Sequence, residues 1–583
     1  MLRALLIACF VTSAAVAAPP VYQPLGAPAD PAVPARWNFY RDYAEATGLL
    51  KQIAAAHPKL CRLESLGKSY DGREMWVLTI TNQANEPAEG PETRPAFWID
   101  GGIHANELQA VDTVLYTAWY LTESYGRNKL ITNLLDQRVF YLLPMMSPDA
   151  RDAHFYDVNT TNGPRSGLRP VDDDQDGRID EDPPEDIDGD GHLVEMRVRD
   201  PQGRWKSHPK YSELMIRAKP DEAGEFRLLG PEGYDNDYDG EVNEDGPGYY
   251  DPNRDWAWKW EPGFVQNGAY RYPFSIEENR LVADFVIAHP NIAGAQSYHN
   301  TGGMILRGPG AKGDVWPQED IAVFDRLAER GVEMLPGYRY LNTAEGLYEV
   351  FGGETDWFYG MRGVFAFTNE LNTPFNFFRE HLEGRNWFGT DEERRKFDDL
   401  LLQGEGFVPW HEVEHPQFGK VEVGGQKKSW GRQPPSFLLE EECHRNMAFT
   451  LWHADQMPQV RVESVEVKEL DGKLREVTAI IMNDKATPTR SAHNVANAIT
   501  RPDLARLTGE GVKVIAALVA DEPFFIQPRD VEHNPAEVEI PTLKSRTPVY
   551  VRWLVEGGEE FTVEIDTIQG GIDRKDVMRK DGK

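Results

Sequence analysis

The chain has 583 residues, of which 40% are hydrophobic and 27% charged, a composition typical of a folded protein rather than a disordered one. Its 95 acidic residues outnumber its 62 basic ones and give a formal net charge of -33 at pH 7. This charge would repel the phosphates of nucleic acids and anionic lipids, so we expect no nucleic-acid partner. The length predicts one large domain with at least one smaller one.

The first residues have the features of a secretory signal peptide. Arg3 provides a positive charge, residues 5–16 are mostly apolar, and the small residues at 15–17 are typical of a cleavage site. We therefore expect a signal peptide at 1–17 and an exported protein, periplasmic or extracellular. A lipoprotein cleavage box at residues 6–9 is the alternative.

Two further features concern membranes and redox state. No later apolar run approaches the roughly 20 residues that a transmembrane helix needs, so no transmembrane segment is predicted. Cleavage of the signal peptide would leave Cys61 and Cys443. These two cysteines could form one disulfide or remain as buried thiols, and the sequence does not decide between the two states.

Helix and strand patterns alternate over residues 37–457, which predicts an α/β domain whose mixed central sheet is flanked by helices. Ser275 and Glu278 have the pattern of a capping box at the start of a helix. Apolar runs predict strands at 96–100, 140–143, 292–298 and 365–367, and helical spacing of apolar residues predicts helices at 108–125, 281–287 and 437–453.

Beyond Pro458 the pattern changes to short alternating runs, which predict an all-β sandwich over residues 458–570. The runs lie at 460–467, 477–481, 512–519 and 549–555. No catalytic combination of residues occurs in this region, which favours an accessory module. Binding of a glycan, a peptide or a partner protein is the alternative.

An acidic insertion at 157–249 interrupts the α/β domain and repeats the motif D-x-D-x-D-G three times. Oxygen ligands at alternate positions, with a glycine at the sharp turn, are what a Ca²⁺ loop needs, so we expect calcium as a cofactor. The usual glutamate at position 12 is missing, and Glu195 and Glu244, or Asp182 and Asp245, could replace it; a solvated acidic loop is the alternative. The candidate ligands are Asp172, Asp174, Asp176, Asp186, Asp188, Asp190, Asp235, Asp237 and Asp239.

A second candidate metal site lies where the predicted strand at 96–100 turns into a helix. His104 and Glu107 are three residues apart there and would share a face. His299 ends another predicted strand, and open α/β sheets place their sites at such strand ends. Two imidazoles and one carboxylate are a donor set that suits Zn²⁺ with one open position.

The order of several motifs is characteristic of one family. Residues 37–81 contain Gly67-Lys68-Ser69-Tyr70-Asp71-Gly72-Arg73, and the later motifs are His104-x-x-Glu107, Asn253-Arg254-Asp255-Trp256, His299, Tyr348 before Gly352-Gly353, and Phe367-Thr368-Asn369-Glu370. Together they resemble the zinc metallocarboxypeptidases related to pancreatic carboxypeptidase A, over residues 37–453 apart from the insertion. The resemblance implies the α/β fold of that family and hydrolysis of peptides with a free C-terminus.

The resemblance also implies catalytic roles. His104, Glu107 and His299 would hold zinc, and Asp251 would orient His104. Glu370 would be the general base that takes a proton from the attacking water and passes it to the leaving amine.

Further roles concern the substrate. Asn253, Arg254 and the Tyr348 hydroxyl would bind its free C-terminal carboxylate, because a planar guanidinium can grip a carboxylate through two hydrogen bonds. Arg197 matches the arginine that stabilises the oxyanion, with Arg199 as the alternative.

The residues expected to set side-chain preference contain no carboxylate at the position that selects basic side chains. Thr355 occupies that position, and Val350 and Thr368 are expected to line the same pocket. This predicts a preference for a neutral or modestly apolar C-terminal residue, or for Lys or Arg if Glu354 turns inward. Asn106 replaces an arginine of the pancreatic enzymes, so contacts to extended substrates are expected to differ.

The main functional hypothesis is therefore an exported zinc carboxypeptidase that removes C-terminal residues from peptides or proteins. An amidase or peptidase acting on peptidoglycan stem peptides is an alternative, because the same zinc chemistry serves both reactions. A binding protein built on an inactive peptidase fold is an alternative of a different class.

Overall fold

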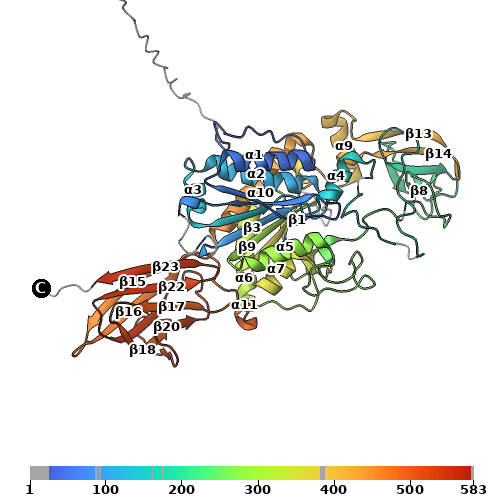
Figure 1. Cartoon of the computed structure of the whole chain (residues 1–583). Helices are drawn as coiled ribbons and strands as arrows, with labels where there is room; N and C mark the ends of the chain where they lie inside the picture. The colour runs from blue at the N-terminus through green and yellow to red at the C-terminus, as the bar shows by residue number, and fades with distance from the viewer. Residues whose placement is uncertain are drawn as a thin grey trace, which may run out of the picture.

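The computed structural model describes residues 25–85, 90, 93–160, 162–172, 176–243, 245–380 and 388–578. The expected signal peptide at 1–17 lies outside these residues, as do Asp174 and Glu244. Three regions follow one another along the molecule, with an α/β body between a C-terminal β-rich region at one end and a smaller β-rich region at the other (Figure 1). Among the described residues no helix is long and apolar enough to cross a membrane.

The α/β body is built on an eight-stranded mixed sheet in the order β1-β2-β4-β3-β9-β12-β10-β11. β3 runs parallel to β4 and β9, β12 runs parallel to β9, and β10 runs parallel to β11, whereas the pairs β1-β2, β2-β4 and β10-β12 are antiparallel. This confirms the predicted fold class. The strands are β1 (Cys61–Lys68), β2 (Glu74–Ile80), β3 (Ala96–Gly101), β4 (Val139–Leu143), β9 (Ile292–Asn300), β10 (Met304–Arg307), β11 (Arg339–Asn342) and β12 (Phe365–Leu371).

Helices cover both faces of this sheet, because alternate side chains of its buried strands point to opposite faces. In β3, Phe97 and Ile99 join the core beneath α1, α2 and α10, whereas Trp98 joins the core beneath α5 and α7 (Figure 1). The helices of the body are α1 (Tyr43–Ala56), α2 (Leu108–Ser124), α3 (Lys129–Gln137), α4 (Pro148–Tyr156), α5 (Glu277–Ala288), α6 (Gln318–Met334), α7 (Glu354–Arg362), α8 (Phe375–Phe378), α9 (Asp391–Phe397) and α10 (Leu439–Asp455).

The capping box predicted at the start of α5 is wrong. α5 begins at Glu277 and its N-cap makes no side-chain hydrogen bond. The hydroxyl of Ser275 instead donates to Asp255 at 2.9 Å, and Glu278 accepts from the backbone N–H of Tyr70 at 2.8 Å. Both side chains therefore bond to groups distant in the sequence and do not cap the helix.

A six-stranded sheet, in the order β13-β14-β5-β8-β6-β7, forms the smaller β-rich region. Four of these strands come from the insertion, between its acidic loops, and two come from much later in the sequence. β14 pairs with β5, with Glu422 opposite Arg197. The strands are β5 (Glu195–Arg199), β6 (Trp205–Ser207), β7 (Met215–Arg217), β8 (Phe226–Pro231), β13 (Phe407–His415) and β14 (Gly419–Gln426).

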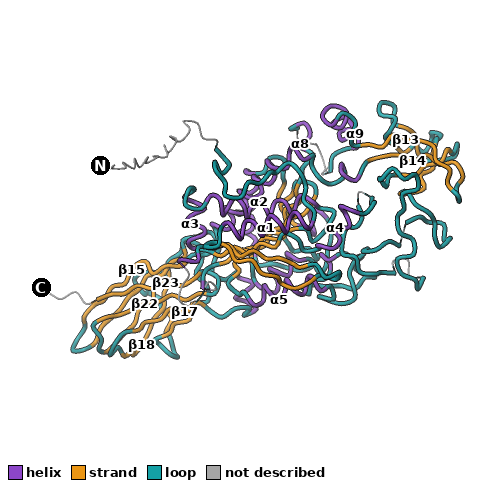
Figure 2. Tube along the Cα trace, turned by 45° about the horizontal axis from the view of Figure 1, so that its top comes forward, coloured by secondary structure: helices purple, strands orange, loops and turns teal. Residues whose placement is uncertain are grey.

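The C-terminal region is a β-sandwich of a five-stranded and a four-stranded sheet around one apolar core (Figure 2). β23 pairs with β22, so the sandwich extends beyond the expected limit at residue 570. Buried hydrogen bonds join it to the α/β body, including Gln569 Nε2 to the carbonyl of Ile292 at 2.9 Å. Its elements are β15 (Val460–Glu469), β16 (Leu474–Asn483), α11 (Ala492–Asn497), β17 (Asp503–Thr508), β18 (Lys513–Ala520), β19 (Arg529–Asp530), β20 (Glu537–Ile540), β21 (Val549–Glu556), β22 (Glu560–Thr567) and β23 (Gly571–Met578).

Cys61 and Cys443 are free, buried thiols in this structure. Burial raises the pKa of Cys61 to about 12, and burial also raises the pKa of Cys443. Neither thiol is therefore ionised near neutral pH.

Candidate metal centre and catalytic cleft

The candidate metal centre forms where three neighbouring strands end. β3 leads into a tight turn at Gly102, which has φ +67° and no room for a side chain, since a Cβ would lie 2.8 Å from Val111 Cγ2. This turn carries His104 and Glu107. β9 lies beside β3 and carries His299 one residue before its end, and β12 lies beside β9 and places Glu370 in register with His299.

The three predicted zinc ligands converge. His104 Nδ1 lies 3.0 Å from Glu107 Oε1, and His299 Nδ1 lies 3.1 Å from Glu107 Oε2 and 3.2 Å from His104 Nδ1. All three side chains are almost completely buried. Although burial opposes ionisation, His104 and His299 hold the pKa of Glu107 well below its ordinary value. A buried carboxylate between two imidazoles is a donor set that fits zinc.

Asp251, which was expected to orient His104, lies next to its ring. Its Oδ1 is 2.8 Å from His104 Nε2, the ring nitrogen that faces away from Glu107. Although burial opposes ionisation, Arg254 and His104 hold the pKa of Asp251 well below its ordinary value. An ionised Asp251 favours the tautomer of His104 that carries its proton on Nε2. The lone pair of Nδ1 is then available to bind a metal.

Glu370 lies beside the centre and lines the same cleft as Glu107. Burial and then the neighbouring Glu107 raise its pKa to about 7, against the opposing charges of His299, Arg165 and Arg432. A carboxyl group with a pKa near neutrality suits proton transfer in both directions.

The predicted carboxylate-binding residues also gather near Asp251. Arg254 is buried, donates from Nη1 to the carbonyl of Asn253 at 2.7 Å, and lies 3.6 Å from Asp251 Oδ2. Its guanidinium is 6.0 Å from the ring centre of Tyr348, which is half exposed in the cleft wall. The Asn253 side chain accepts from the backbone N–H of Glu354 at 2.8 Å and so fixes the start of α7.

The predicted specificity residues are only partly brought together. Thr355 on α7 lies 3.4 Å, oxygen to oxygen, from Thr368 on β12. Glu354 is turned into the protein: it is 1% exposed, it accepts from Ser297 Oγ at 2.9 Å, and burial and then Asp100 raise its pKa well above the ordinary value. Glu354 is therefore not available to the substrate, and the preference for a C-terminal Lys or Arg that depended on it is not expected.

The prediction for Arg197 is wrong. Its guanidinium pairs with Glu422 at 2.6 Å and lies between the rings of Phe226 and Trp410, 3.9 Å from each ring centre. It holds the six-stranded sheet together and does not reach Glu107 or His299. Arg199, the alternative, is exposed and also pairs with Glu422.

Two other arginines take the place expected for Arg197. Arg165 Nη1 lies 2.9 Å from Glu107 Oε1, and Arg165 Nη2 lies 3.2 Å from His104 Nε2. Arg432 Nη1 lies 3.8 Å from Glu107 Oε1 and donates to the carbonyl of Asn300 at 3.2 Å. Both provide positive charge at the mouth of the metal centre.

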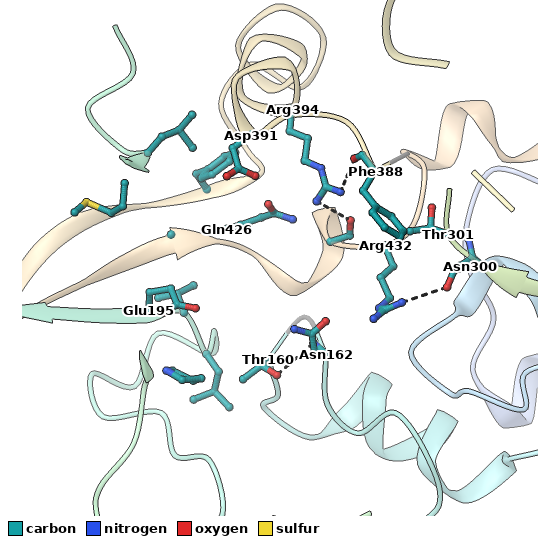
Figure 3. A pocket seen from close by; sticks show the side chains of 18 of the residues that line it. Thr160, Asn162, Glu195, Asn300, Thr301, Phe388, Asp391, Arg394, Gln426 and Arg432 are labelled. Atoms are coloured by element: carbon teal, nitrogen blue, oxygen red, sulfur yellow. Dashed lines mark hydrogen bonds between the residues drawn. The ribbon is translucent and has the colours of Figure 1, made fainter. Parts of the chain in front are cut away.

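These side chains line a cavity of about 730 Å³ between the α/β body and the six-stranded sheet. Figure 3 shows Arg432 and Asn300 on one side of it and Glu195 with Gln426 on the strands of the other. The insertion and the late strands β13 and β14 thus form one wall of the cleft.

The acidic loops form three groups of carboxylates among the described residues, apart from the cleft. In each group one oxygen of every member lies within 4.8 Å of the others. Asp172 and Asp190 belong to none of these groups, and neither do Asp182, Glu195 or Asp245. The groups are Asp176, Glu181 and Asp237; Asp186, Asp188 and Glu232; and Asp235, Asp237 and Asp239.

Comparison with known proteins identifies two family models that match parts of the chain. The zinc carboxypeptidase model matches residues 47–170 and 238–383, and a second model, described as a domain of unknown function, matches residues 459–578. A zinc carboxypeptidase of Saccharothrix mutabilis subsp. capreolus is 34% identical over 127 residues, which are 22% of this chain and 28% of that protein. Carboxypeptidase B of Astacus astacus is 25% identical over 354 residues, 58% of this chain and 89% of that protein.

A third relative carries a different description. The inactive metallocarboxypeptidase ECM14 of Saccharomyces cerevisiae is 35% identical over 113 residues, 19% of this chain and 26% of that protein. This alignment and the one with the Saccharothrix protein therefore each span little more than a quarter of the relative.

The ranges matched by the zinc carboxypeptidase model include Arg165 but not Arg197. His104, Glu107, His299 and Glu370 all lie inside them, and so does Arg165, whereas Arg197 lies in the gap between them. The match also extends into both ends of the insertion expected at 157–249, because it runs to residue 170 and resumes at 238.

Proposed function

We propose that this chain, which belongs to the zinc carboxypeptidase family, hydrolyses the C-terminal peptide bond of peptides or proteins. The observation that carries the proposal is the convergence of His104, Glu107 and His299 beside Glu370 at the floor of a large cleft.

His104, Glu107 and His299 would hold the zinc ion. One ligand atom of each residue lies within 4.8 Å of the others, and Glu107 lines the cleft from which a substrate would approach. When bound, zinc supplies a Lewis acid that polarises the scissile carbonyl and lowers the pKa of water. Asp251 keeps the His104 ring in the orientation that this requires.

Glu370 acts as the general base. It takes a proton from the attacking water and delivers it to the leaving amine, so the same carboxyl group is first base and then acid. Arg165, with its guanidinium next to Glu107 and His104, stabilises the negative charge that develops on the carbonyl oxygen.

Arg254 and Tyr348 select the end of a chain. A free α-carboxylate entering the cleft would meet the Arg254 guanidinium, whose charge only Asp251 balances within 4 Å among the described residues. A peptide bond in the middle of a chain has no such group to offer. Removal of one residue at a time follows from this arrangement.

The experiment is digestion of a peptide mixture with varied C-termini, read by mass spectrometry, with and without a zinc chelator. Stepwise loss of single C-terminal residues that chelation abolishes supports the proposal. Internal cleavage would contradict it, and cleavage confined to peptidoglycan stem peptides would favour the amidase alternative.

One relative is named an inactive metallocarboxypeptidase, so a second candidate is a binding protein that has lost catalysis. The retained ligands and Glu370 argue against it. A zinc-loaded protein that binds peptides but releases no product from any of them would establish this second candidate.

Two further proposals concern the rest of the chain. Residues 1–17 direct export to the periplasm or the outside of the cell. The β-sandwich serves as an accessory module that is fixed to the α/β body through buried contacts such as Gln569 with Ile292.

A further inference from the structure

The first and third acidic loops face each other in the structure. Residues 172–182 and 235–245 occupy corresponding positions of the repeated motif, and their eleventh residues, Asp182 and Asp245, form a β-bridge. The backbone N–H of Asp182 donates to the carbonyl of Asp245 at 3.2 Å. The two loops are therefore paired through equivalent positions.

The Asp182 carboxylate holds this pair together. Its Oδ1 accepts from the backbone and the side chain of Asn236 at 3.2 and 3.1 Å, and its Oδ2 accepts from the backbone N–H of Asn243 at 3.0 Å. Asp182 is completely buried. Because its oxygens are occupied by the partner loop, it links the loops and is not available as a metal ligand.

Five other carboxylates meet between the paired loops. Asp237 belongs to two groups, one with Asp235 and Asp239 of its own loop and one with Asp176 and Glu181 of the opposite loop. No described lysine or arginine forms an ion pair with Asp235, Asp237 or Asp239. Carboxylates this close repel one another unless a cation lies between them or one of them takes up a proton.

Asp235 provides an independent sign of a missing ligand. It is 9% exposed, and its Oδ1 is buried without any hydrogen-bond partner. A buried carboxylate oxygen with no partner is costly, and native proteins rarely leave one in that state. The same side chain belongs to the group with Asp237 and Asp239, so a cation held by these three residues would satisfy it.

We infer that the paired loops bind calcium ions on both sides of Asp237, one with Asp235 and Asp239 and the other with Asp176 and Glu181. The ligands are all oxygens, which excludes a preference for soft metals. Carboxylates from two irregular loops, with the turn glycines Gly177 and Gly240 at positive φ, suit the large and irregular shell of Ca²⁺ better than the strict octahedron of Mg²⁺.

Calcium in this place would support the cleft. Pro231 ends β8 just before the third loop and lines the cavity, and Val194 and Glu195 line it just after the second loop. Glu232 braces this region by accepting from the backbone N–H groups of Ile187 and Val194. The paired loops therefore anchor the wall that faces the metal centre.

The test is a calcium titration of the full-length, zinc-loaded protein in calcium-free buffer, followed by calorimetry and by the melting temperature. Wild-type protein should take up calcium with an affinity of roughly 10⁻⁶ to 10⁻³ M and melt at a higher temperature with it. Asp235→Asn should lose the calcium of one group and Asp237→Asn that of both. Asp221→Asn, an exposed change of the same charge in the same insertion, should behave as wild type.

Three outcomes would overturn the inference. They are the absence of calcium uptake by the wild type, full uptake by Asp237→Asn, and an equal rise in melting temperature with Mg²⁺. If Asp237→Asn does not fold, the wild-type titration and Asp235→Asn still decide. None of these readouts needs catalysis, so they stand or fall separately from the carboxypeptidase proposal.

Discussion

Asp251 Oδ1 lies 2.8 Å from Nε2 of His104, while Asp251 Oδ2 lies 3.6 Å from the guanidinium of Arg254. One carboxylate thus contacts both a candidate metal ligand and the arginine proposed to bind the substrate's carboxylate. We predict that Asp251→Asn lowers zinc affinity about 10- to 100-fold. Competition with a chromogenic chelator measures this, with Asp221→Asn as the control; an unchanged zinc affinity would show that Asp251 does not orient His104.

Glu370→Gln removes the general base but keeps the shape of the side chain. We expect kcat to fall by about 10²- to 10⁴-fold, because the amide cannot take the proton of the attacking water. Zinc content, measured by elemental analysis, should stay at the wild-type level. The exposed change Glu405→Gln is the matched control. Equal rates for wild type and Glu370→Gln would point to a different base.

The two arginines that compete for the oxyanion role can be separated by experiment. Arg165→Ala should reduce kcat by about 10²- to 10³-fold, since its guanidinium lies next to Glu107. Arg197→Ala should leave the rate on a short peptide nearly unchanged and lower the stability of the six-stranded sheet by about 1–3 kcal/mol, because the guanidinium pairs with Glu422 and packs between the rings of Phe226 and Trp410. If Arg197→Ala lowers kcat and Arg165→Ala does not, Arg197 would be the residue that stabilises the oxyanion.

We predict that Arg254 contributes to binding only when the substrate has a free C-terminal carboxylate. Arg254→Ala should lower kcat/KM about 10- to 10²-fold on such a peptide, through loss of a charged hydrogen bond. The same peptide with a C-terminal amide should react slowly with wild type and variant alike. If the variant slows both peptides equally, Arg254 is structural and does not bind the carboxylate.

His453 makes stability depend on pH. Burial lowers its pKa to about 3, so the unfolded chain takes up a proton near pH 6.5 and the folded chain only near pH 3. Between these values the unfolded state binds more protons, and stability falls by about 1.4 kcal/mol per pH unit as the pH decreases. His453→Gln should flatten this dependence in thermal melts between pH 6.5 and 4. An identical slope in the variant would show that His453 is not buried as a neutral group.

The sequence was sufficient where a local pattern decides the structure. The strand and turn before His104 and the strand leading to His299 follow from apolar runs and their ends. The strand predicted at 365–367 runs on to Leu371 and so includes Glu370. The approach of these residues to one another was expected from the α/β fold that the family resemblance implied.

The sequence was insufficient where distant segments meet. The residues around Arg197 do not predict that its partner is Glu422, which lies on a strand much later in the chain. The assignment of Arg197 failed for that reason, and Arg432 was missed for the same reason. Asp182 looked like a possible metal ligand, because only the structure shows that Asn236 and Asn243 occupy its oxygens.

The pairing of β5 with β14 has a consequence for the order in which the protein is made. β5 emerges from the ribosome together with its neighbour β8, but its other neighbour is synthesised only after the whole sheet of the α/β body has been completed. During synthesis the zinc ligands and Glu370 are therefore all present before the wall opposite them can form. A nascent chain would pass through a stage in which the proposed catalytic residues have all been synthesised while the cleft is still open on one side.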